Sequence, residues 1–158
     1  MNKIWAPWRI RYIEKSKNKE SCVLCFFAKN KKLDKKHFVI LRGEYCFSVL
    51  NIYPYNNGHF MTSPLRHIKN IEDLSKEEIL DIFEIIKKTK AIINSALKPN
   101  GYNIGINLGK VSGAGIDKHL HIHVVPRWQG DTNFMPTISN TKIISQSLKE
   151  LYDKLTKK

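Results

Sequence analysis

Three histidines alternate with apolar residues in the segment 119–125, which reads HLHIHVV. Successive side chains of a β-strand point to opposite faces, so the three imidazoles would share one face and the apolar side chains the other. The apolar face suits a core, whereas three adjacent imidazoles carry nitrogens that need partners and titrate near neutral pH. The alternation therefore predicts a strand over 119–125 that carries a metal site, a nucleophile with its supporting groups, or both.

A glycine-rich loop, 109–115, lies directly before the histidines. Small residues allow backbone N–H groups to approach a ligand closely, and successive N–H groups form a nest that binds anions. Glycine loops are common, but the position of this one beside the histidine strand predicts a phosphate held against the imidazoles. The residues expected to surround that phosphate are Ser112, Gly113, Ala114, Gly115 and Ile116.

Four further segments have the length and composition of β-strands, at 38–41, 45–50, 59–63 and 102–107. Between the last two, Ser75 and Glu78 form a capping-box pattern that predicts the start of a long helix ending before 99–101. Its apolar residues at helical spacing are Ile79, Ile82, Phe83, Ile86, Ile93 and Leu97. A second amphipathic helix is predicted over 143–155. Short turns between strands favour antiparallel pairing, so the expected fold class is α+β with about five strands.

Cys22 and Cys25 have the spacing of zinc ligands, and a closed tetrahedral site needs two more nitrogen or sulfur donors. His67 and one imidazole of the 119–125 strand are candidates for these donors. Two alternatives remain open, namely a pair of buried thiols and a redox-active dithiol. The redox interpretation is the less favoured of the two, because no thioredoxin-like βαβ pattern surrounds the cysteines.

The charge is strongly basic and uneven along the chain. The net charge is +13, and residues 1–42 contribute +9 of it, with twelve basic and three acidic side chains. Attraction of a polyphosphate or nucleic acid is one interpretation. A solvated, solubilising face is favoured instead, because most of the basic residues are lysine and arginine recognises phosphate better.

The sequence predicts a cytoplasmic protein. The 158 residues contain no apolar run long enough to span a membrane and no apolar core of a secretory signal at the start. Three cysteines do not make a disulfide framework, which favours a reducing compartment. We expect one domain over 1–158, made of a basic segment with the CxxC pair (1–36), a catalytic core (37–136) and a C-terminal helical part (137–158).

The sequence resembles the histidine triad (HIT) family of nucleotidyl hydrolases and transferases. The histidine segment fits the family signature, and 51–59 (NIYPYNNGH) with 63–67 (SPLRH) looks like its first nucleotide-binding strand pair. Two further segments, 5–9 (WAPWR) and 126–135 (PRWQGDTNFM), are similar to a bacterial subgroup that acts on diadenosine tetraphosphate. The 113–117 loop (GAGID) departs from the Gly-Gln-Ser or Gly-Gln-Thr of the short HIT hydrolases. The resemblance implies a HIT-like fold.

The resemblance also implies roles for individual residues. His121 matches the nucleophile that attacks the α-phosphorus, and His123 matches the residue that touches the phosphate and assists the leaving group. His119 matches a zinc ligand in one branch of the superfamily, which would complete a structural Zn²⁺ site with Cys22, Cys25 and His67. Asn51 and Asn107 match positions near the ribose or the phosphate, and His59 matches a fourth, supporting histidine.

The function implied is cleavage of dinucleoside polyphosphates through a nucleotidyl-histidine intermediate, with inorganic phosphate as the acceptor. One alternative is a HIT hydrolase of nucleoside phosphoramidates or adenylylated amines. A second, from another class, is a non-catalytic module that binds nucleotides or nucleic acid through the basic N-terminal third. The resemblance further implies a homodimer, and neither nucleic acid nor a membrane is expected as a partner of the enzyme.

Overall fold

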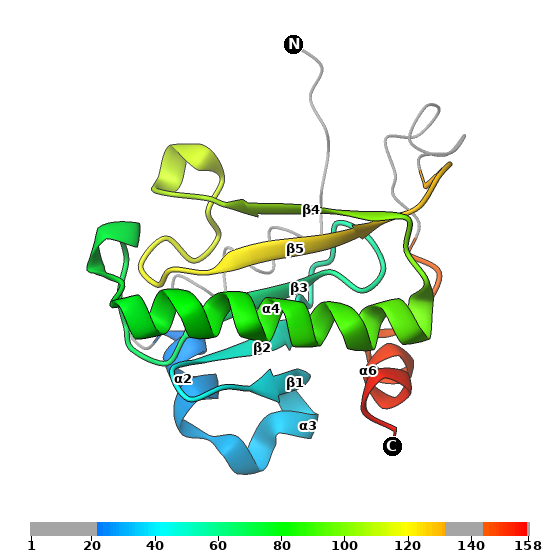
Figure 1. The fold of residues 1–158 in the computed structure, drawn as a ribbon, viewed down its shortest axis with the longest axis horizontal. Helices are drawn as coiled ribbons and strands as arrows, with labels where there is room; N and C mark the ends of the chain where they lie inside the picture. The colour runs from blue at the N-terminus through cyan, green and yellow to red at the C-terminus, as the bar shows by residue number, and fades with distance from the viewer. Residues whose placement is uncertain (1–21, 132–143, 158) are drawn as a thin grey trace.

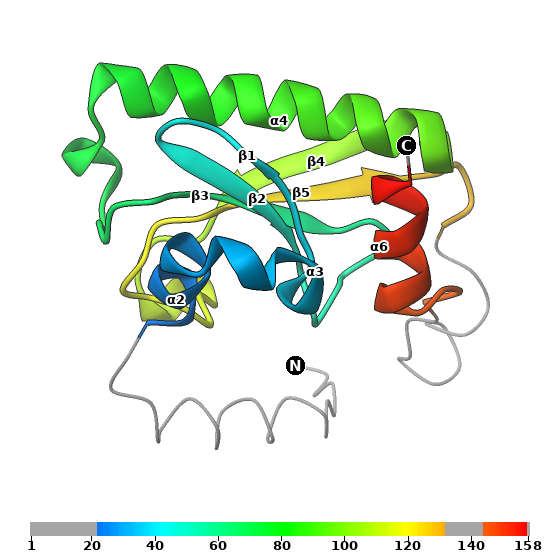
Figure 2. The same cartoon turned by 90° about the horizontal axis from the view of Figure 1, so that it is seen from below.

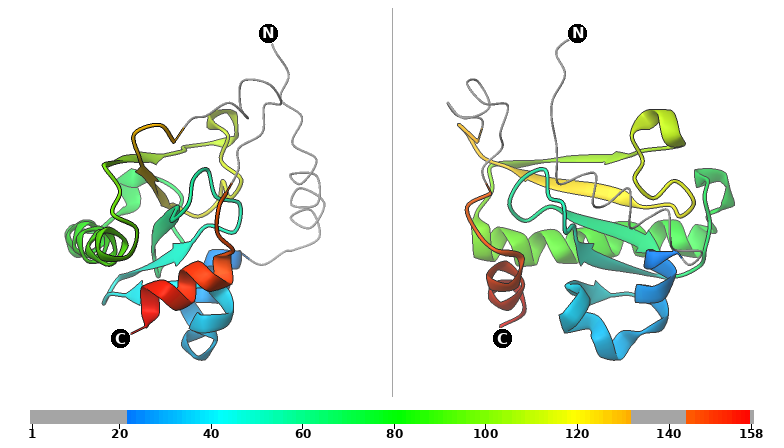
Figure 3. Two further views of the ribbon diagram at one scale, coloured as in Figure 1. Left: turned by 90° about the vertical axis from the view of Figure 1, so that its right-hand side faces the viewer. Right: turned by 180° about the vertical axis from the view of Figure 1, so that it is seen from behind.

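The computed structural model describes residues 22–131 and 144–157. Its centre is a five-stranded antiparallel sheet in the order β1-β2-β3-β5-β4, so that β1 and β4 form the two edges (Figure 3). The strands are β1 (Val39–Arg42), β2 (Cys46–Leu50), β3 (Phe60–Pro64), β4 (Gly101–Ile106) and β5 (Ile122–Arg127). The predicted α+β class is confirmed.

Helices lie on both faces of the sheet. The long helix α4 (Lys76–Leu97) runs along one face, and α2 (Val23–Lys29) lies on the opposite side (Figures 1 and 2). The first face packs a core in which Phe60 and Val124 meet α4 and α6 (Leu148–Thr156). The second face carries a smaller cluster of Leu24, Val39, Phe47, Val49 and Met61. Because side chains alternate along each strand, residues paired with Met61 also project from the second face.

The long helix begins where the capping box predicts. The Glu78 backbone N–H donates to Ser75 Oγ over 3.2 Å, and the Glu78 carboxylate accepts from the Ser75 N–H over 2.9 Å. The buried stripe includes Ile82, Ile86 and Ile93, as expected. Ile79 and Phe83 fit the same spacing but remain 41% and 61% exposed, because the helix turns them away from the sheet.

Three local predictions differ from the structure. Strand β5 begins at Ile122 rather than at 119 and continues through Pro126 to Arg127, because β4 pairs with it up to that residue. The last helix begins at Leu148, after Ser147 as its N-cap, and the four described residues before it are not helical. The short helices α2, η1 (Lys31–Leu33) and α3 (Asp34–His37) were not predicted.

Some predicted features lie outside the described residues, namely the segment 5–9 and residues 132–135 of the second subgroup motif. The division into 1–36, 37–136 and 137–158 stays a prediction. None of the helices within residues 22–131 and 144–157 is both long and apolar enough to cross a membrane.

Candidate active site and metal cluster

The ring of His121, the residue directly before β5, is buried and is held by a backbone acceptor. Its Nδ1 atom lies 2.9 Å from the carbonyl oxygen of His119. A carbonyl oxygen only accepts, so we assign the ring proton of neutral His121 to Nδ1, which leaves the lone pair on Nε2. Burial lowers the pKa of His121, although the bond to His119 opposes this shift, so the ring is neutral at pH 7. A neutral imidazole with Nε2 unprotonated is a nucleophile.

His59 and Tyr55 fix the proton of His123 in the same way. The Tyr55 backbone N–H donates to His59 Nδ1 over 3.1 Å, so that nitrogen is an acceptor and the His59 proton lies on Nε2. His59 Nε2 is 3.0 Å from His123 Nδ1 and therefore donates to it. The proton of neutral His123 must then lie on its own Nε2. His123 thus presents a hydrogen-bond donor, whereas His121 presents a lone pair.

The rings of these residues form a continuous row. The centroid distances are 4.8 Å between His121 and His123, 5.1 Å between His123 and His59, and 4.8 Å between His59 and the stacked ring of Tyr55. Burial lowers the pKa of His59 to about 3, with repulsion from His123 and His121 adding to the shift. Burial, followed by repulsion from His121, lowers the pKa of His123 to about 4. The row is therefore uncharged at neutral pH.

The four residues predicted to bind zinc also come together. Each of Cys22, Cys25, His67 and His119 offers one donor atom, and all four atoms lie within 4.8 Å of one another. Cys22 and Cys25 come from the start of α2, His67 from the loop after β3, and His119 from the segment before β5. His119 Nδ1 is 3.2 Å from Cys22 Sγ, and His67 Nδ1 is 3.1 Å from Cys25 Sγ. The four residues form a cluster that could hold a metal ion.

The donor set fits a metal ion that prefers nitrogen and sulfur. His119 Nε2 lies 3.0 Å from the carbonyl oxygen of Pro64 and donates to it, so the lone pair of His119 is on Nδ1 and faces the thiols. Burial, followed by the neighbouring Cys22, raises the pKa of Cys25 to about 11. A bound cation would lower the pKa of Cys25 again, because coordination favours the thiolate.

Of the remaining predicted residues, Asn51 contacts the histidine row directly and Ile116 packs on the same face of the sheet. The Asn51 side chain is 3.4 Å from His59 Nδ1 and also accepts from the Tyr53 N–H, which places it in the turn between β2 and β3. Asn107 follows β4 directly and is half-buried. Ile116 packs against the cluster on the second sheet face that includes Met61, the strand partner of His123. That contact brings the end of the glycine loop over the histidine face.

The rest of the glycine loop is open. Lys110–Ser112 forms a 3-10 turn between Gly109 and Gly113, whose φ angles of 76° and 86° favour glycine. Ser112 Oγ donates to the Gly109 carbonyl over 2.7 Å, so its hydroxyl proton stays within the loop. Ser112, Gly113 and Gly115 are exposed, and Ala114 is half-buried. Within the part of the chain that the structure describes, no hydrogen bond joins these four residues to the histidine row.

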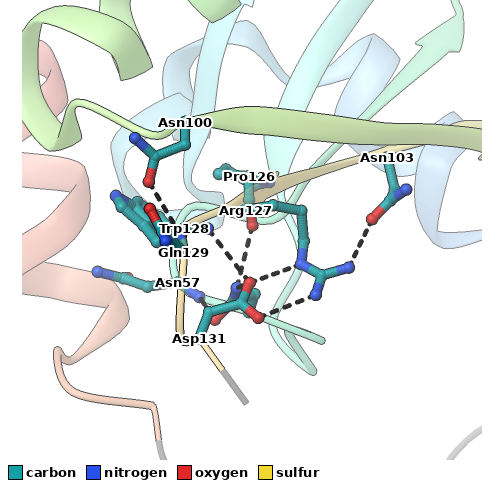
Figure 4. Close-up of polar contacts among 9 residues, drawn as sticks. Asn57, Asn100, Asn103, Pro126, Arg127, Trp128, Gln129 and Asp131 are labelled. Carbon is teal, nitrogen blue, oxygen red and sulfur yellow. Dashed lines mark hydrogen bonds and ion pairs between the residues drawn. The ribbon is translucent and has the colours of Figure 1, made fainter.

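A polar network at the far end of β5 was not predicted from the sequence (Figure 4). Asp131, with a side chain only 7% exposed, accepts from Asn56 Nδ2 over 2.8 Å and pairs with both Nε and Nη2 of Arg127. Arg127 Nη1 also donates to Asn103 on β4 over 2.7 Å. The network joins the β2–β3 turn, the end of β5 and the edge strand. The only sequence signal for this network was the polar character of residues 126–131, which belong to the segment that is similar to the bacterial subgroup.

A five-stranded antiparallel sheet, one long helix and a row of histidines entering β5 define a histidine triad protein. The HIT domain model matches residues 32–130, and the chain belongs to the HIT family. It is similar to the AP-4-A phosphorylase of Mycobacterium tuberculosis strain H37Rv, at 35% identity over 156 residues that cover 95% of this chain and 80% of the relative.

Two further comparisons support this placement. A Zn-bound histidine triad family protein from Mycobacterium smegmatis superposes with a TM-score of 0.67 at 26% identity, covering 85% of this chain and 90% of that structure. The asymmetrical bis(5'-nucleosyl)-tetraphosphatase of Schizosaccharomyces pombe is 29% identical over 93 residues, which cover 59% of this chain and 50% of the relative.

Proposed function

We propose that this protein is a nucleotidyltransferase that cleaves dinucleoside polyphosphates such as diadenosine tetraphosphate, with His121 as the nucleophile. The observation that carries the proposal is the 2.9 Å contact from His121 Nδ1 to the His119 carbonyl oxygen, which leaves Nε2 unprotonated. The substrate class comes from similarity to a phosphorylase and a tetraphosphatase that are named for such substrates.

In the first step, His121 Nε2 attacks the α-phosphorus, and the bond from phosphorus to the bridging oxygen breaks. The leaving group is ATP, which departs as an anion and needs no proton. The Nε2–H of His123 donates a hydrogen bond to the oxygen on which charge accumulates. The positive charge that develops on the His121 ring is stabilised at Nδ1 by the carbonyl oxygen of His119.

In the second step, an oxygen of inorganic phosphate attacks the same phosphorus, and the electron pair of the P–N bond returns to His121 Nε2. The product is ADP, and the enzyme regains its starting protonation. Backbone N–H groups of residues 112–116 would bind the non-bridging oxygens, which would require this exposed loop to close over the substrate. Asn51 and Asn107 would contact the ribose or the phosphate.

The Cys22, Cys25, His67 and His119 cluster would hold a Zn²⁺ ion with four protein ligands. Such an ion would cross-link segments of the chain and would not take part in the reaction, since four protein ligands leave no coordination position for substrate. Its ligands join α2, the loop after β3 and the segment before β5, and would therefore fix the backbone that orients His121. A reducing cytoplasm would keep the two thiols available to the metal.

A homodimer is the assembly we propose. Four apolar side chains are exposed on α4 and on the same side of the edge strand β4, namely Ile79, Leu80, Phe83 and Ile104. Leu80 and Phe83 are 70% and 61% exposed, which is unfavourable for large apolar side chains in water. A second copy that covered this face would remove them from water.

The test of the function is a product analysis on wild-type protein and on His121→Ala. Wild-type protein incubated with labelled diadenosine tetraphosphate is expected to give ATP and ADP when phosphate is present, and to carry labelled AMP covalently when phosphate is left out. The variant is expected to lose both turnover and the covalent label while it still binds AMP. His37→Ala is the matched control, because its ring stacks on Phe27 outside the row.

Three outcomes would point elsewhere. AMP as the product regardless of phosphate would indicate a hydrolase rather than a phosphorylase. Unchanged turnover of His121→Ala would reject His121 as the nucleophile. Absence of turnover in wild-type protein, with nucleotide binding that is the same in His121→Ala and weakens steeply with salt, would support a non-catalytic binding module.

A further inference from the structure

Gly105 on the edge strand lies directly opposite His123. The two residues are Cα partners in the antiparallel register of β4 and β5, as Met61 and His123 are on the other side. Directly opposed residues project from the same face of a sheet, so the missing side chain of Gly105 would lie on the histidine face. The strand position directly beside His123, which presents its Nε2–H, therefore has no side chain.

The space left at Gly105 is open. Among the described residues, none beyond its two chain neighbours has an atom within 4 Å of the position that a Cβ atom would take. Its φ angle is not in the left-handed region, so nothing in the backbone requires glycine there. Asn103 lies on the same face two residues earlier, tied to Arg127 (Figure 4). We call this empty space beside Gly105 the notch. It exists because residue 105 has no side chain, and the backbone conformation there does not require glycine.

With His121 as the proposed nucleophile, the leaving group would depart on the side of His123, where Gly105 lies. His59 occupies His123 Nδ1, so only Nε2 of that ring is available to a substrate. An in-line displacement places the leaving oxygen opposite the attacking His121 Nε2, next to the hydrogen-bond donor that stabilises it. The group beyond that oxygen needs room beside His123, and Gly105 provides it.

We propose that Gly105 is a specificity-determining residue whose missing side chain admits the polyphosphate chain of the leaving nucleotide. The proposal rests on the function proposed above and identifies the substrate class as nucleotides with a long leaving group. A side chain at 105 narrows this path without touching the site of the transferred nucleotide.

Gly105→Val and Gly105→Ala test the proposal, with Gly101→Val as the matched control. Gly101 lies on the same strand and face, is equally open, and pairs with Arg127 rather than with His123. It is about 13 Å from Gly105 along the strand. Both positions are in a strand and unstrained, so the variants are expected to fold with a thermal midpoint no lower than that of wild type.

Two measurements are made on each protein: kcat/KM for diadenosine tetraphosphate with phosphate, and calorimetric binding of AMP as a mimic of the transferred nucleotide. Gly105→Val is expected to lower kcat/KM about tenfold or more, because its side chain would occupy the path of the leaving group, with a smaller loss for Gly105→Ala. AMP affinity is expected to stay within about twofold of wild type, and Gly101→Val to match wild type in both measurements.

Unchanged kcat/KM in Gly105→Val would overturn the proposal. A parallel loss of AMP affinity would overturn it too, because the notch would then belong to the transferred nucleotide. Failure of the proposed function gives a different result, since wild-type protein would then form neither the labelled intermediate nor the products.

Discussion

The carbonyl oxygen of His119 accepts a hydrogen bond from His121 Nδ1, while the side chain of His119 completes the Cys/His cluster. One residue therefore contributes its ring to the candidate metal site and its backbone to the ring that we propose as the nucleophile. The Leu120 N–H donates to the Ile68 carbonyl over 2.7 Å, which holds the segment next to the loop that carries His67. Metal binding and the orientation of His121 are therefore mechanically connected.

Removing a metal ligand is expected to reduce both metal content and activity. Cys25→Ala should weaken zinc binding by more than the roughly tenfold to hundredfold typical of residues that only orient ligands. It should also lower the thermal midpoint, because the cluster joins segments that are far apart in sequence. Metal analysis and calorimetry of purified protein provide the measurement. Cys46→Ala is the control, since this buried core cysteine lies outside the cluster and should leave zinc content at one per chain.

His59 is expected to act as a positioning residue through its hydrogen bond to His123. His59→Ala removes the donor that fixes the His123 proton on Nε2, and kcat should fall about tenfold to hundredfold, as for other partners that orient functional histidines. His59→Gln keeps an N–H donor and should recover part of the loss. Steady-state kinetics with diadenosine tetraphosphate measure both. Equal activities of the two variants would show that hydrogen bonding at this position does not matter.

Acidification below about pH 6.5 is expected to destabilise the protein. The pKa of His59 is about 3 and that of His123 about 4 in the folded state, below the ordinary value of 6.5. Between these values the unfolded chain binds protons that the folded chain does not. The contribution of these two histidines to stability is therefore fully present well above pH 6.5 and is lost as the pH falls through 6.5 towards 4. The drop in thermal midpoint from pH 7 to pH 5 should be smaller in His59→Gln. An equal drop in both proteins would argue against a neutral, buried His59.

The Asp131 network is expected to contribute to stability. Asp131→Ala removes the acceptor of Asn56 and Arg127, and the loss of charge-assisted bonds to a buried carboxylate should cost about 1–3 kcal/mol of unfolding free energy. Denaturant unfolding provides the measurement. Asp153→Ala is the control, because its ion pair with the 78%-exposed Lys149 is a surface pair of small value. A change at Asp131 no larger than in the control would contradict the role of the network.

Much of the fold could be read from local sequence signals. The capping box at Ser75 and Glu78 predicted the start of α4, because both of its hydrogen bonds form within four residues. The turn-bounded apolar runs predicted five strands to within three residues at each end. The short helices before β1 escaped prediction, since they depend on tertiary contacts such as Arg42 binding Asp34 and the Phe27 carbonyl.

The sequence by itself determined which chemical groups the site contains, because the alternating histidines and the CxxC spacing are local patterns. Only the tertiary structure decided their protonation and partners. His59 meets His123 across 64 residues, and Cys22 meets His119 across 97. It also decided that Phe83 faces solvent and that Gly105 lies beside His123. The physical reason is that these contacts depend on strand register and on the burial of whole faces, which no short window of sequence specifies.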